Sequence, residues 1–191
     1  SAAKRSRSRS VGSAARVLRA GSPSTPDPAE LAALPDDALL EIVQRQTFRY
    51  FWEGAHPVSG LALDHRTSGK EADDKVSVGG AGFGVMALIV AVERRWVTRD
   101  AALERLGRML KLLLHARCYH GAYPHFMNGR TGESIPFWRK DDAADLVETS
   151  FLMMGLLCAR EYFARDTPEE AAARSHISIL WDEVEWNWFT Q

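Results

Sequence analysis

Three carboxylates lie close together in the second half of the chain. Asp141, Asp145 and Glu148 are separated by four and then three positions, so they would lie above one another on one face of a helix. Further along, the same face is built from small and apolar residues: Leu152, Gly155, Leu156 and Ala159. Carboxylates that share a half-enclosed space repel one another, so at least one is expected to hold its proton near neutral pH. General acid/base catalysis requires such a difference between two acids.

Helix capping offers a second explanation for part of this cluster. Acids are favoured in the first turn of a helix, and Asp141 or Asp142 could be the N-cap. Glu148 fits this explanation poorly, because it would lie about two turns inside the predicted helix. Glu148 is therefore the main candidate for a catalytic acid. Asp141 is expected to be its partner or to act through a water molecule, and Asp145 belongs to the same cluster.

The composition predicts one folded domain that does not bind nucleic acid. The chain has 191 residues, of which 46% are hydrophobic, enough for a sizeable core. Residues 1–26 carry six basic and no acidic side chains, which leaves 18 basic and 25 acidic residues elsewhere, a net charge of −7. An acidic domain disfavours nucleic acid as a partner. Two cysteines and no paired ligand motif predict neither a disulfide framework nor a metal site, and no cofactor is expected.

No membrane-spanning segment is predicted. The longest apolar run, residues 81–92, has 12 residues, whereas a transmembrane helix needs roughly 20. The sequence starts with Ser1 and shows no signal peptide. The expected location is the bacterial periplasm or the outside of the cell if the full-length protein carries a signal peptide, and the cytoplasm otherwise.

The hydrophobic pattern predicts an all-α domain that follows a short arm. Residues 1–28 are rich in Ser, Arg and Pro, which indicates a disordered arm. In residues 29–191, amphipathic helices alternate with helices that are apolar on nearly all sides. The amphipathic helices are expected near 36–53, 100–116 and 168–189, and the apolar ones near 79–95 and 142–163. The glycines of residues 79–84 favour close helix packing over phosphate binding, because their spacing matches no phosphate-binding motif.

One β-hairpin is predicted between the third and fourth helices. Residues 123–127 and 133–137 flank Asn128-Gly129-Arg130-Thr131-Gly132, a typical turn sequence. The hairpin leads directly into the acidic helix. We expect it at the same end of the helices as residues 79–84.

Several separate motifs resemble the glycoamylase-like family of glycoside hydrolases, which includes bacterial endo-β-1,2-glucanases and related sophorose-releasing enzymes. The resemblance extends from about Asp36 to the last residue. The motifs are Phe48-Arg49-Tyr50-Phe51-Trp52, His56-Pro57-Val58-Ser59-Gly60-Leu61, Ser77-Val78-Gly79-Gly80-Ala81-Gly82-Phe83-Gly84, Gly121-Ala122-Tyr123-Pro124-His125-Phe126, Asp145-Leu146-Val147-Glu148-Thr149-Ser150 and Val184-Glu185-Trp186-Asn187-Trp188-Phe189.

This resemblance implies an (α/α)6 toroid, of which residues 29–191 would be the N-terminal half. It also implies an inverting hydrolase whose substrate is a β-glucan, and among β-glucans it favours β-1,2-glucan. Glu148 and Asp141 match family acids that are important for catalysis, and Asp145 lies in the same cluster. A further important Glu of the family lies beyond the matched half, so this chain alone is expected to be inactive.

Candidate sugar-binding residues surround the acidic segment. Aromatic rings stack on sugar faces, and Arg donates hydrogen bonds to hydroxyl groups. On these grounds the candidates are Trp138, Arg139, His125, Tyr123 and Phe126. The resemblance implies an Asp-Arg pair after Ser59-Gly60-Leu61, where this chain has Asp64-His65-Arg66, so Asp64 and Arg66 complete the set.

Two other classes of protein would explain the same sequence. One is a module that binds glucan without cleaving it, and the other is a helical scaffold in which the acids only cap helices and keep the surface soluble. Hydrolysis that depends on Glu148 separates the enzyme from both. Glucan binding without turnover separates the binding module from the scaffold.

Overall fold

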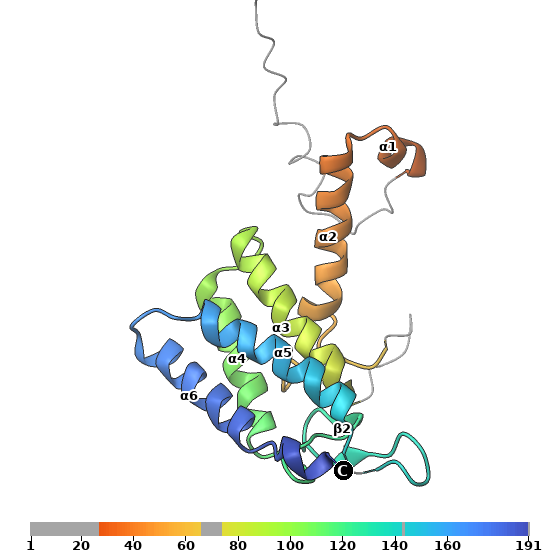
Figure 1. Ribbon diagram of the computed structural model, residues 1–191. Helices are drawn as coiled ribbons and strands as arrows, with labels where there is room; N and C mark the ends of the chain where they lie inside the picture. Colours follow the sequence, from red (N-terminus) through yellow and green to blue (C-terminus); the bar gives the residue numbers. More distant parts are fainter. Residues whose placement is uncertain (1–26, 66–73, 143, 191) are drawn as a thin grey trace, which may run out of the picture. The chain divides into compact units, whose positions relative to one another are not determined.

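The computed structural model describes residues 27–65, 74–142 and 144–190. The chain divides into two compact units, residues 1–45 and 46–191. Helices make up most of the described chain, as the all-α prediction requires, and a small sheet of three strands accompanies them (Figure 1).

The first unit contains α1 (Pro28–Ala32) and the beginning of α2 (Asp36–Trp52). Asp27 caps α1 by accepting a hydrogen bond from the Ala29 N–H at 2.9 Å. The sequence predicted α2 with nearly these bounds but not α1, because five residues are too few to show a periodic pattern. The predicted disordered arm lies almost wholly outside the described residues.

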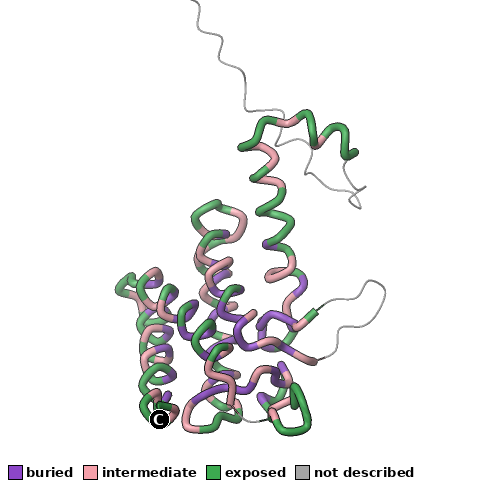
Figure 2. The backbone as a smooth tube through the Cα atoms, turned by 45° about the vertical axis from the view of Figure 1, so that its right-hand side comes forward, coloured by how far each residue is buried: buried purple, intermediate pink, exposed green. Residues whose placement is uncertain are grey.

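Two apolar helices, α3 (Val78–Glu93) and α5 (Leu146–Tyr162), form the centre of the second unit. They pack backbone to backbone: a Cβ atom added to Gly155 would lie 2.2 Å from the Gly82 carbonyl oxygen, and one added to Gly82 would lie 2.1 Å from the Phe151 carbonyl oxygen. The predicted role of the glycines in close packing is therefore confirmed. The helices appear side by side in Figure 1, and many of their residues are purple, the colour of buried positions, in Figure 2.

The amphipathic helices α4 (Arg99–Leu113) and α6 (Pro168–Asp182) pack outside this pair. Thr98 caps α4 and Thr167 caps α6 by accepting hydrogen bonds from N–H groups of the first turn. Buried apolar residues of both helices, such as Leu110 and Ile177, belong to the same core cluster as those of α3 and α5. The predicted alternation of apolar and amphipathic helices is thus observed in the second unit.

The prediction that the last helix continues towards Phe189 was wrong. Helix α6 ends at Asp182, and a separate 3-10 helix, η2 (Trp186–Phe189), follows. Between them the Glu185 N–H donates to the His120 carbonyl at 3.1 Å. A Cβ atom added to Gly121, which has φ +73°, would lie 2.0 Å from the Glu183 carbonyl oxygen. The chain therefore leaves the helix because it packs against the turn at His120 and Gly121.

The predicted hairpin is confirmed, and the structure adds a third strand. Strands β2 (Phe126–Asn128) and β3 (Ser134–Ile135) are antiparallel, and β1 (Lys75–Ser77) pairs with the other side of β2. The Val78 N–H donates to the His125 carbonyl at 3.2 Å. The hairpin and the start of α3 therefore lie at the same end of the helices, as predicted. The sequence did not reveal β1, because three residues carry no recognisable alternation.

The acidic segment does not form the single helical face that its spacing predicted. Helix α5 begins at Leu146, and Asp145 is its N-cap. Asp141 lies before the helix in a turn, where its N–H donates to the Trp138 carbonyl at 3.0 Å and its carbonyl accepts from the Phe137 N–H at 2.9 Å. The alternative prediction, that Asp141 or Asp142 caps this helix, was also wrong. Asp145 is the cap instead, because its N–H donates to the Tyr123 carbonyl at 2.7 Å and this bond holds it at the start of the helix.

Candidate active site

The carboxylate of Glu148 lies at the N-terminal end of α3. Its Oε2 atom accepts a hydrogen bond from the Gly79 N–H at 2.7 Å and one from the Ser77 hydroxyl at 3.2 Å. Ser77 is the N-cap of α3, and its Oγ atom in turn accepts from the Gly80 N–H at 3.2 Å. Helix N-termini favour negative charge, because their first N–H groups have no partner within the helix. The first turn of α5 is thus attached to the first turn of α3 through a half-buried carboxylate.

Asp145 uses both of its carboxylate oxygens in hydrogen bonds. Oδ1 accepts from the N–H groups of Val147 and Glu148 at 2.9 and 3.0 Å, and Oδ2 pairs with Nδ1 of His125 at 2.9 Å. Burial disfavours the charged form of Asp145, but the hydrogen bonds from the Glu148 N–H and the His125 ring outweigh it and hold its pKa below the usual range. Asp145 is therefore an ionised group that fixes the start of α5 and the ring of His125.

Aromatic rings continue the site from His125. The imidazole stacks on Phe137 with ring centroids 4.4 Å apart and meets the ring of Phe126 edge to face, also at 4.4 Å. Lys75 Nζ lies 4.5 Å from the centroid of Phe126 and forms an ion pair with Asp64 at 2.7 Å. Phe137 is 54% exposed. The site thus brings together a carboxylate, an imidazole, an ammonium group and an exposed aromatic ring.

The predicted site residues are only partly brought together. Glu148, Asp145, His125 and Phe126 lie within one continuous set of contacts, which reaches Asp64 through Lys75. Burial disfavours the charged form of Asp64, but hydrogen bonds from Lys75 and His65 hold its pKa below the usual value.

Tyr123 is separated from this surface. Its side chain is 1% exposed, and its hydroxyl donates to the Leu113 carbonyl at 3.0 Å, so it is a core residue. Trp138 is 72% exposed and Arg139 is also exposed, both in the turn that contains Asp141. Arg66 lies outside the described residues.

Comparison with known proteins identifies what the chain resembles. No family model matches it. It is 43% identical over 159 residues to an exo β-1,2-glucooligosaccharide sophorohydrolase (non-reducing end) of Parabacteroides distasonis, a match that covers 83% of this chain and 22% of that protein.

Solved structures agree. An endo-β-1,2-glucanase from Chitinophaga pinensis, in complex with sophorotriose and glucose, is 46% identical with a TM-score of 0.79, over 82% of this chain and 38% of that one. A glucoamylase candidate from Bacteroides uniformis is 50% identical with a TM-score of 0.78, over 83% of this chain and 38% of that one. The homologues of this chain are glucoamylase-like β-1,2-glucan hydrolases. The chain spans about a fifth to two fifths of their length.

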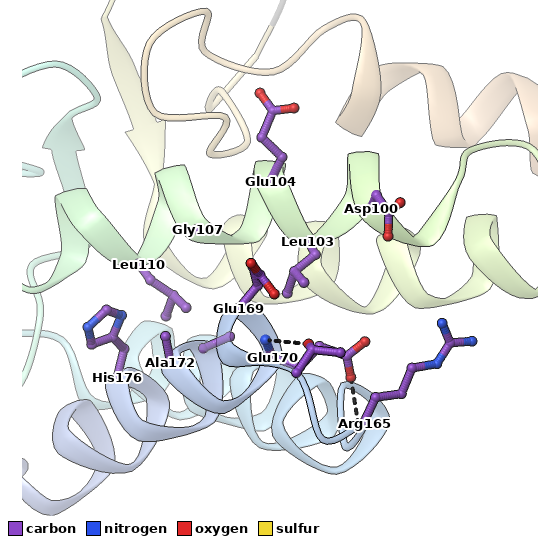
Figure 3. A pocket seen from close by; sticks show the side chains of 12 residues that line it. Asp100, Leu103, Glu104, Gly107, Leu110, Arg165, Glu169, Glu170, Ala172 and His176 are labelled. Atoms are coloured by element: carbon purple, nitrogen blue, oxygen red, sulfur yellow. Dashed lines mark hydrogen bonds between the residues drawn. The ribbon is translucent and has the colours of Figure 1, made fainter.

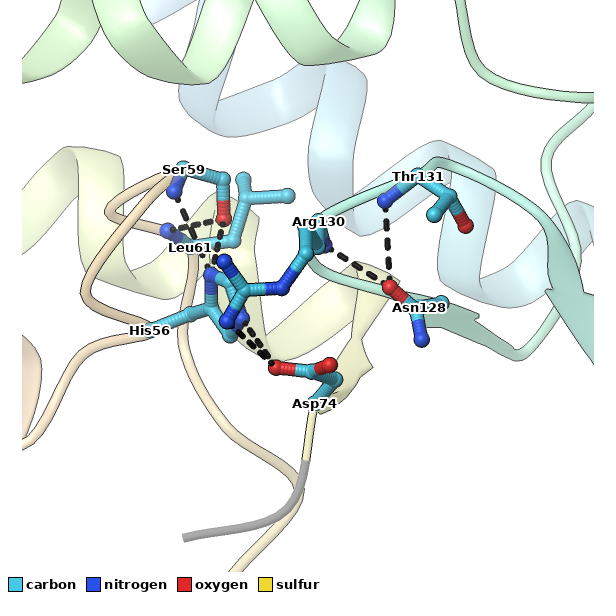
Figure 4. A network of polar contacts seen from close by, with 7 residues as sticks. All are labelled: His56, Ser59, Leu61, Asp74, Asn128, Arg130 and Thr131. Carbon is cyan, nitrogen blue, oxygen red and sulfur yellow. Dashed lines mark hydrogen bonds and ion pairs between the residues drawn. The ribbon is translucent and has the colours of Figure 1, made fainter.

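Besides these residues, the chain contains a polar network that sequence reasoning missed (Figure 4). His56, which is 1% exposed, pairs through Nε2 with Asp74 Oδ1 at 2.9 Å, and its Nδ1 accepts from the Ser59 N–H at 3.2 Å. Arg130 Nη2 lies 3.4 Å from the same Asp74 oxygen. Hydrogen bonds from His56 and then from Arg130 hold the pKa of Asp74 below its usual value.

This network does not provide a nucleophile, although it combines Ser, His and Asp. Ser59 is 2% exposed, and its hydroxyl lies beside Nδ1 of His56, an atom that already accepts the Ser59 N–H. The network instead holds the loop of residues 56–61 against the hairpin and the residue before β1. The only sequence signal for it was the long irregular loop after α2.

A cavity of the second unit lies elsewhere, between α4 and α6 (Figure 3). It has a volume of about 630 Å³, and its lining includes Asp100, Glu104, Glu169, Glu170 and His176. Glu170 is 3% exposed and already paired, with Arg99 at 2.7 Å and with the Arg165 N–H at 2.7 Å. None of the residues that line this cavity belongs to the set of contacts around Glu148.

Two further features were sought among the described residues, a metal-ligand cluster and a helix able to span a membrane. Within residues 27–65, 74–142 and 144–190, no group of three or more His, Cys, Asp or Glu side chains is placed to hold a metal ion. Over the same residues, no helix combines the length and apolar character needed to cross a bilayer.

Proposed function

We propose that this chain is part of a β-1,2-glucan hydrolase in which Glu148 is the principal catalytic acid or base. The observation that carries the proposal is that the start of α3 binds one oxygen of Glu148, beside the His125–Asp145 pair and the exposed ring of Phe137. Among the described residues no hydrogen bond reaches the second oxygen, Oε1. The homologous β-1,2-glucan hydrolases support the same substrate class.

The proposed setting is one part of an (α/α)6 toroid. The alternation of inner α3 and α5 with outer α4 and α6 is the arrangement that concentric layers of helices require. The shared segment makes up 22% of one homologue and 38% of another, so both are more than twice as long as that segment. We therefore assign residues 29–191 to the N-terminal part of a larger glucoamylase-like domain.

The proposed chemistry is inverting general acid/base hydrolysis. Such a reaction needs one acid at the leaving oxygen and one carboxylate that activates water, about 6.5–9.5 Å apart. Asp145 is a poor second reacting group, because both of its oxygens are engaged. Asp141 stays a candidate for the partner or the water relay, now from the turn before α5. A carboxylate from another part of the domain is expected to face Glu148 across the substrate.

The proposed sugar contacts are a subset of those predicted. His125 belongs to the contact set around Asp145, and Trp138 and Arg139 are exposed in the neighbouring turn. Phe126 touches the His125 ring but is only 9% exposed, so it supports that ring from the core. Tyr123 is likewise excluded from direct contact by its burial. Its backbone carbonyl instead fixes Asp145.

The test compares β-1,2-glucan with starch and β-1,3-glucan as substrates. It uses both the 191-residue chain and the complete natural polypeptide that carries it. We expect the complete polypeptide to release β-1,2-linked oligosaccharides and the 191-residue chain to be inactive. Binding of β-1,2-glucan without turnover by the complete polypeptide would support the binding module instead. Absence of both binding and turnover would support the scaffold.

A further inference from the structure

The contact between Glu148 and the start of α3 has a consequence for the chemistry of the site. We infer that Ser77 and Gly79 are positioning residues that hold Glu148 by Oε2, which leaves Oε1 as the oxygen that meets the reacting group. This inference rests on the proposed function. It assigns separate tasks to the two oxygens of one carboxylate and names two residues, outside the acidic segment, on which the reaction depends.

Ser77 is fixed on several sides before it meets Glu148. It pairs with Phe126 in the sheet, and its N–H donates to the Ala62 carbonyl at 3.2 Å. Its Oγ atom accepts the Gly80 N–H at 3.2 Å, so the hydroxyl hydrogen remains available for Glu148 Oε2, also at 3.2 Å. A Ser hydroxyl has one hydrogen and two acceptor lone pairs, so it can accept from Gly80 and donate its single hydrogen to Glu148 at the same time. Ser77 therefore directs its proton to one defined oxygen.

Gly79 matters in two ways: its N–H binds Glu148, and its lack of a side chain leaves room for the carboxylate. The N–H belongs to the first turn of α3, where no helical carbonyl is available to it, and it donates to Oε2 at 2.7 Å. A Cβ atom added to Gly79 would lie 2.8 Å from Oε2 and 3.1 Å from Cδ of Glu148. Any larger residue would therefore displace the carboxylate, although it would keep the N–H.

The same contact could simply join two helices, so the test must separate positioning from stability. Ser77→Ala removes a helix cap as well as the donor to Glu148. Thr98→Ala is the matched control, because Thr98 caps α4 through the Ala101 N–H at 3.2 Å without touching the site. Gly107→Ala is the control for Gly79→Ala, because a Cβ atom at Gly107 meets nothing within 4 Å. Ser77→Thr keeps the hydroxyl and should therefore be as active as the parent.

The experiment measures kcat and KM for β-1,2-glucan hydrolysis by the complete natural polypeptide and these variants. A misplaced catalytic group costs up to about 10²-fold in rate. We expect kcat to fall about 10²-fold in Gly79→Ala and about tenfold or more in Ser77→Ala, with KM within about twofold of the parent. Ser77→Thr, Thr98→Ala and Gly107→Ala should keep the parental kcat. Equal kcat in parent, Gly79→Ala and Ser77→Ala would overturn the inference while leaving the proposed function intact.

A second measurement tests the contact without any activity. In the 191-residue chain, the amide proton of Gly79 should resonate downfield, and Glu148→Ala should move it upfield because the hydrogen bond is lost. An unchanged resonance would overturn the inference at its structural step. If the parent polypeptide fails to hydrolyse β-1,2-glucan while the Gly79 shift is present, the proposed function fails, and the catalytic task of the two residues fails with it.

Discussion

Replacement of Gly155 by Ala tests the packing that brings Gly79 and Glu148 together. The added Cβ would lie 2.2 Å from the Gly82 carbonyl oxygen and 2.8 Å from its carbon, about 1.2 Å short of ordinary contact at 3.4 Å. The obstacle is helix backbone, so α3 and α5 must separate. Overpacking costs about 1–3 kcal/mol, and we take the upper end because backbone cannot rotate away. Ala gains up to about 1 kcal/mol over Gly in a helix, which leaves a net loss of about 2 kcal/mol.

The assay is thermal and urea unfolding of the 191-residue chain, followed by far-UV circular dichroism. For a chain of this size a loss of 2 kcal/mol lowers Tm by about 4–8 °C. Gly107→Ala makes the same chemical change in α4 with nothing within 4 Å of the new Cβ. This control substitution should raise the free energy of unfolding by about 0.5–1 kcal/mol, because Ala is favoured over Gly inside a helix. If Gly155→Ala is as stable as Gly107→Ala, the backbone contact between α3 and α5 is refuted.

Three further predictions concern other parts of the chain. Hydrogen bonds from Arg99 hold the pKa of Glu170 below its ordinary 4.5, so the stability they add is present above that pH and lost as the pH falls below it. Glu170→Gln should lower the free energy of unfolding by about 2–3 kcal/mol at neutral pH and should weaken the fall of Tm at acid pH. A Tm–pH profile of the variant that runs parallel to that of the parent would contradict this. His56→Ala should lower the free energy of unfolding, measured in urea, by about 1–3 kcal/mol, because it leaves buried polar groups without partners. His115→Ala, at an exposed position, should change it little. The 191-residue chain should self-associate in sedimentation velocity through the exposed apolar residues Phe83, Val90, Phe151 and Met154; Met154→Glu should weaken this, and a monomer at all concentrations would refute it.

The helices of the second unit were largely predictable from the sequence, because each combines a periodic pattern with a recognisable start. Thr98 and Thr167 were identified as caps from their positions alone, and the glycines before Val85 indicated close packing. Patterns of this kind depend on residues a few positions apart. They need no information on the tertiary structure.

The candidate site was only partly predictable, because it depends on contacts between distant segments. Asp141, Asp145 and Glu148 have helical spacing, yet the Tyr123 carbonyl fixes Asp145 as the cap and excludes Asp141 from the helix. The residues that hold Glu148 lie about 70 positions away, at the start of α3. No local pattern reports such a contact. The three-residue strand β1, which positions Ser77, was missed for the same reason.

If Glu148 carries the reaction, Glu148→Gln should abolish most of the activity. The change keeps the shape of the side chain and removes its ionisation. In the complete natural polypeptide we predict a fall in kcat of about 10²–10⁴ on β-1,2-glucan, the usual contribution of a positioned acid or base, with substrate binding retained. Asp142→Asn is the matched control, because Asp142 is exposed and its contact to Ser134 is made by its backbone carbonyl; it should keep nearly full activity. A Gln variant as active as the parent would remove Glu148 from the mechanism.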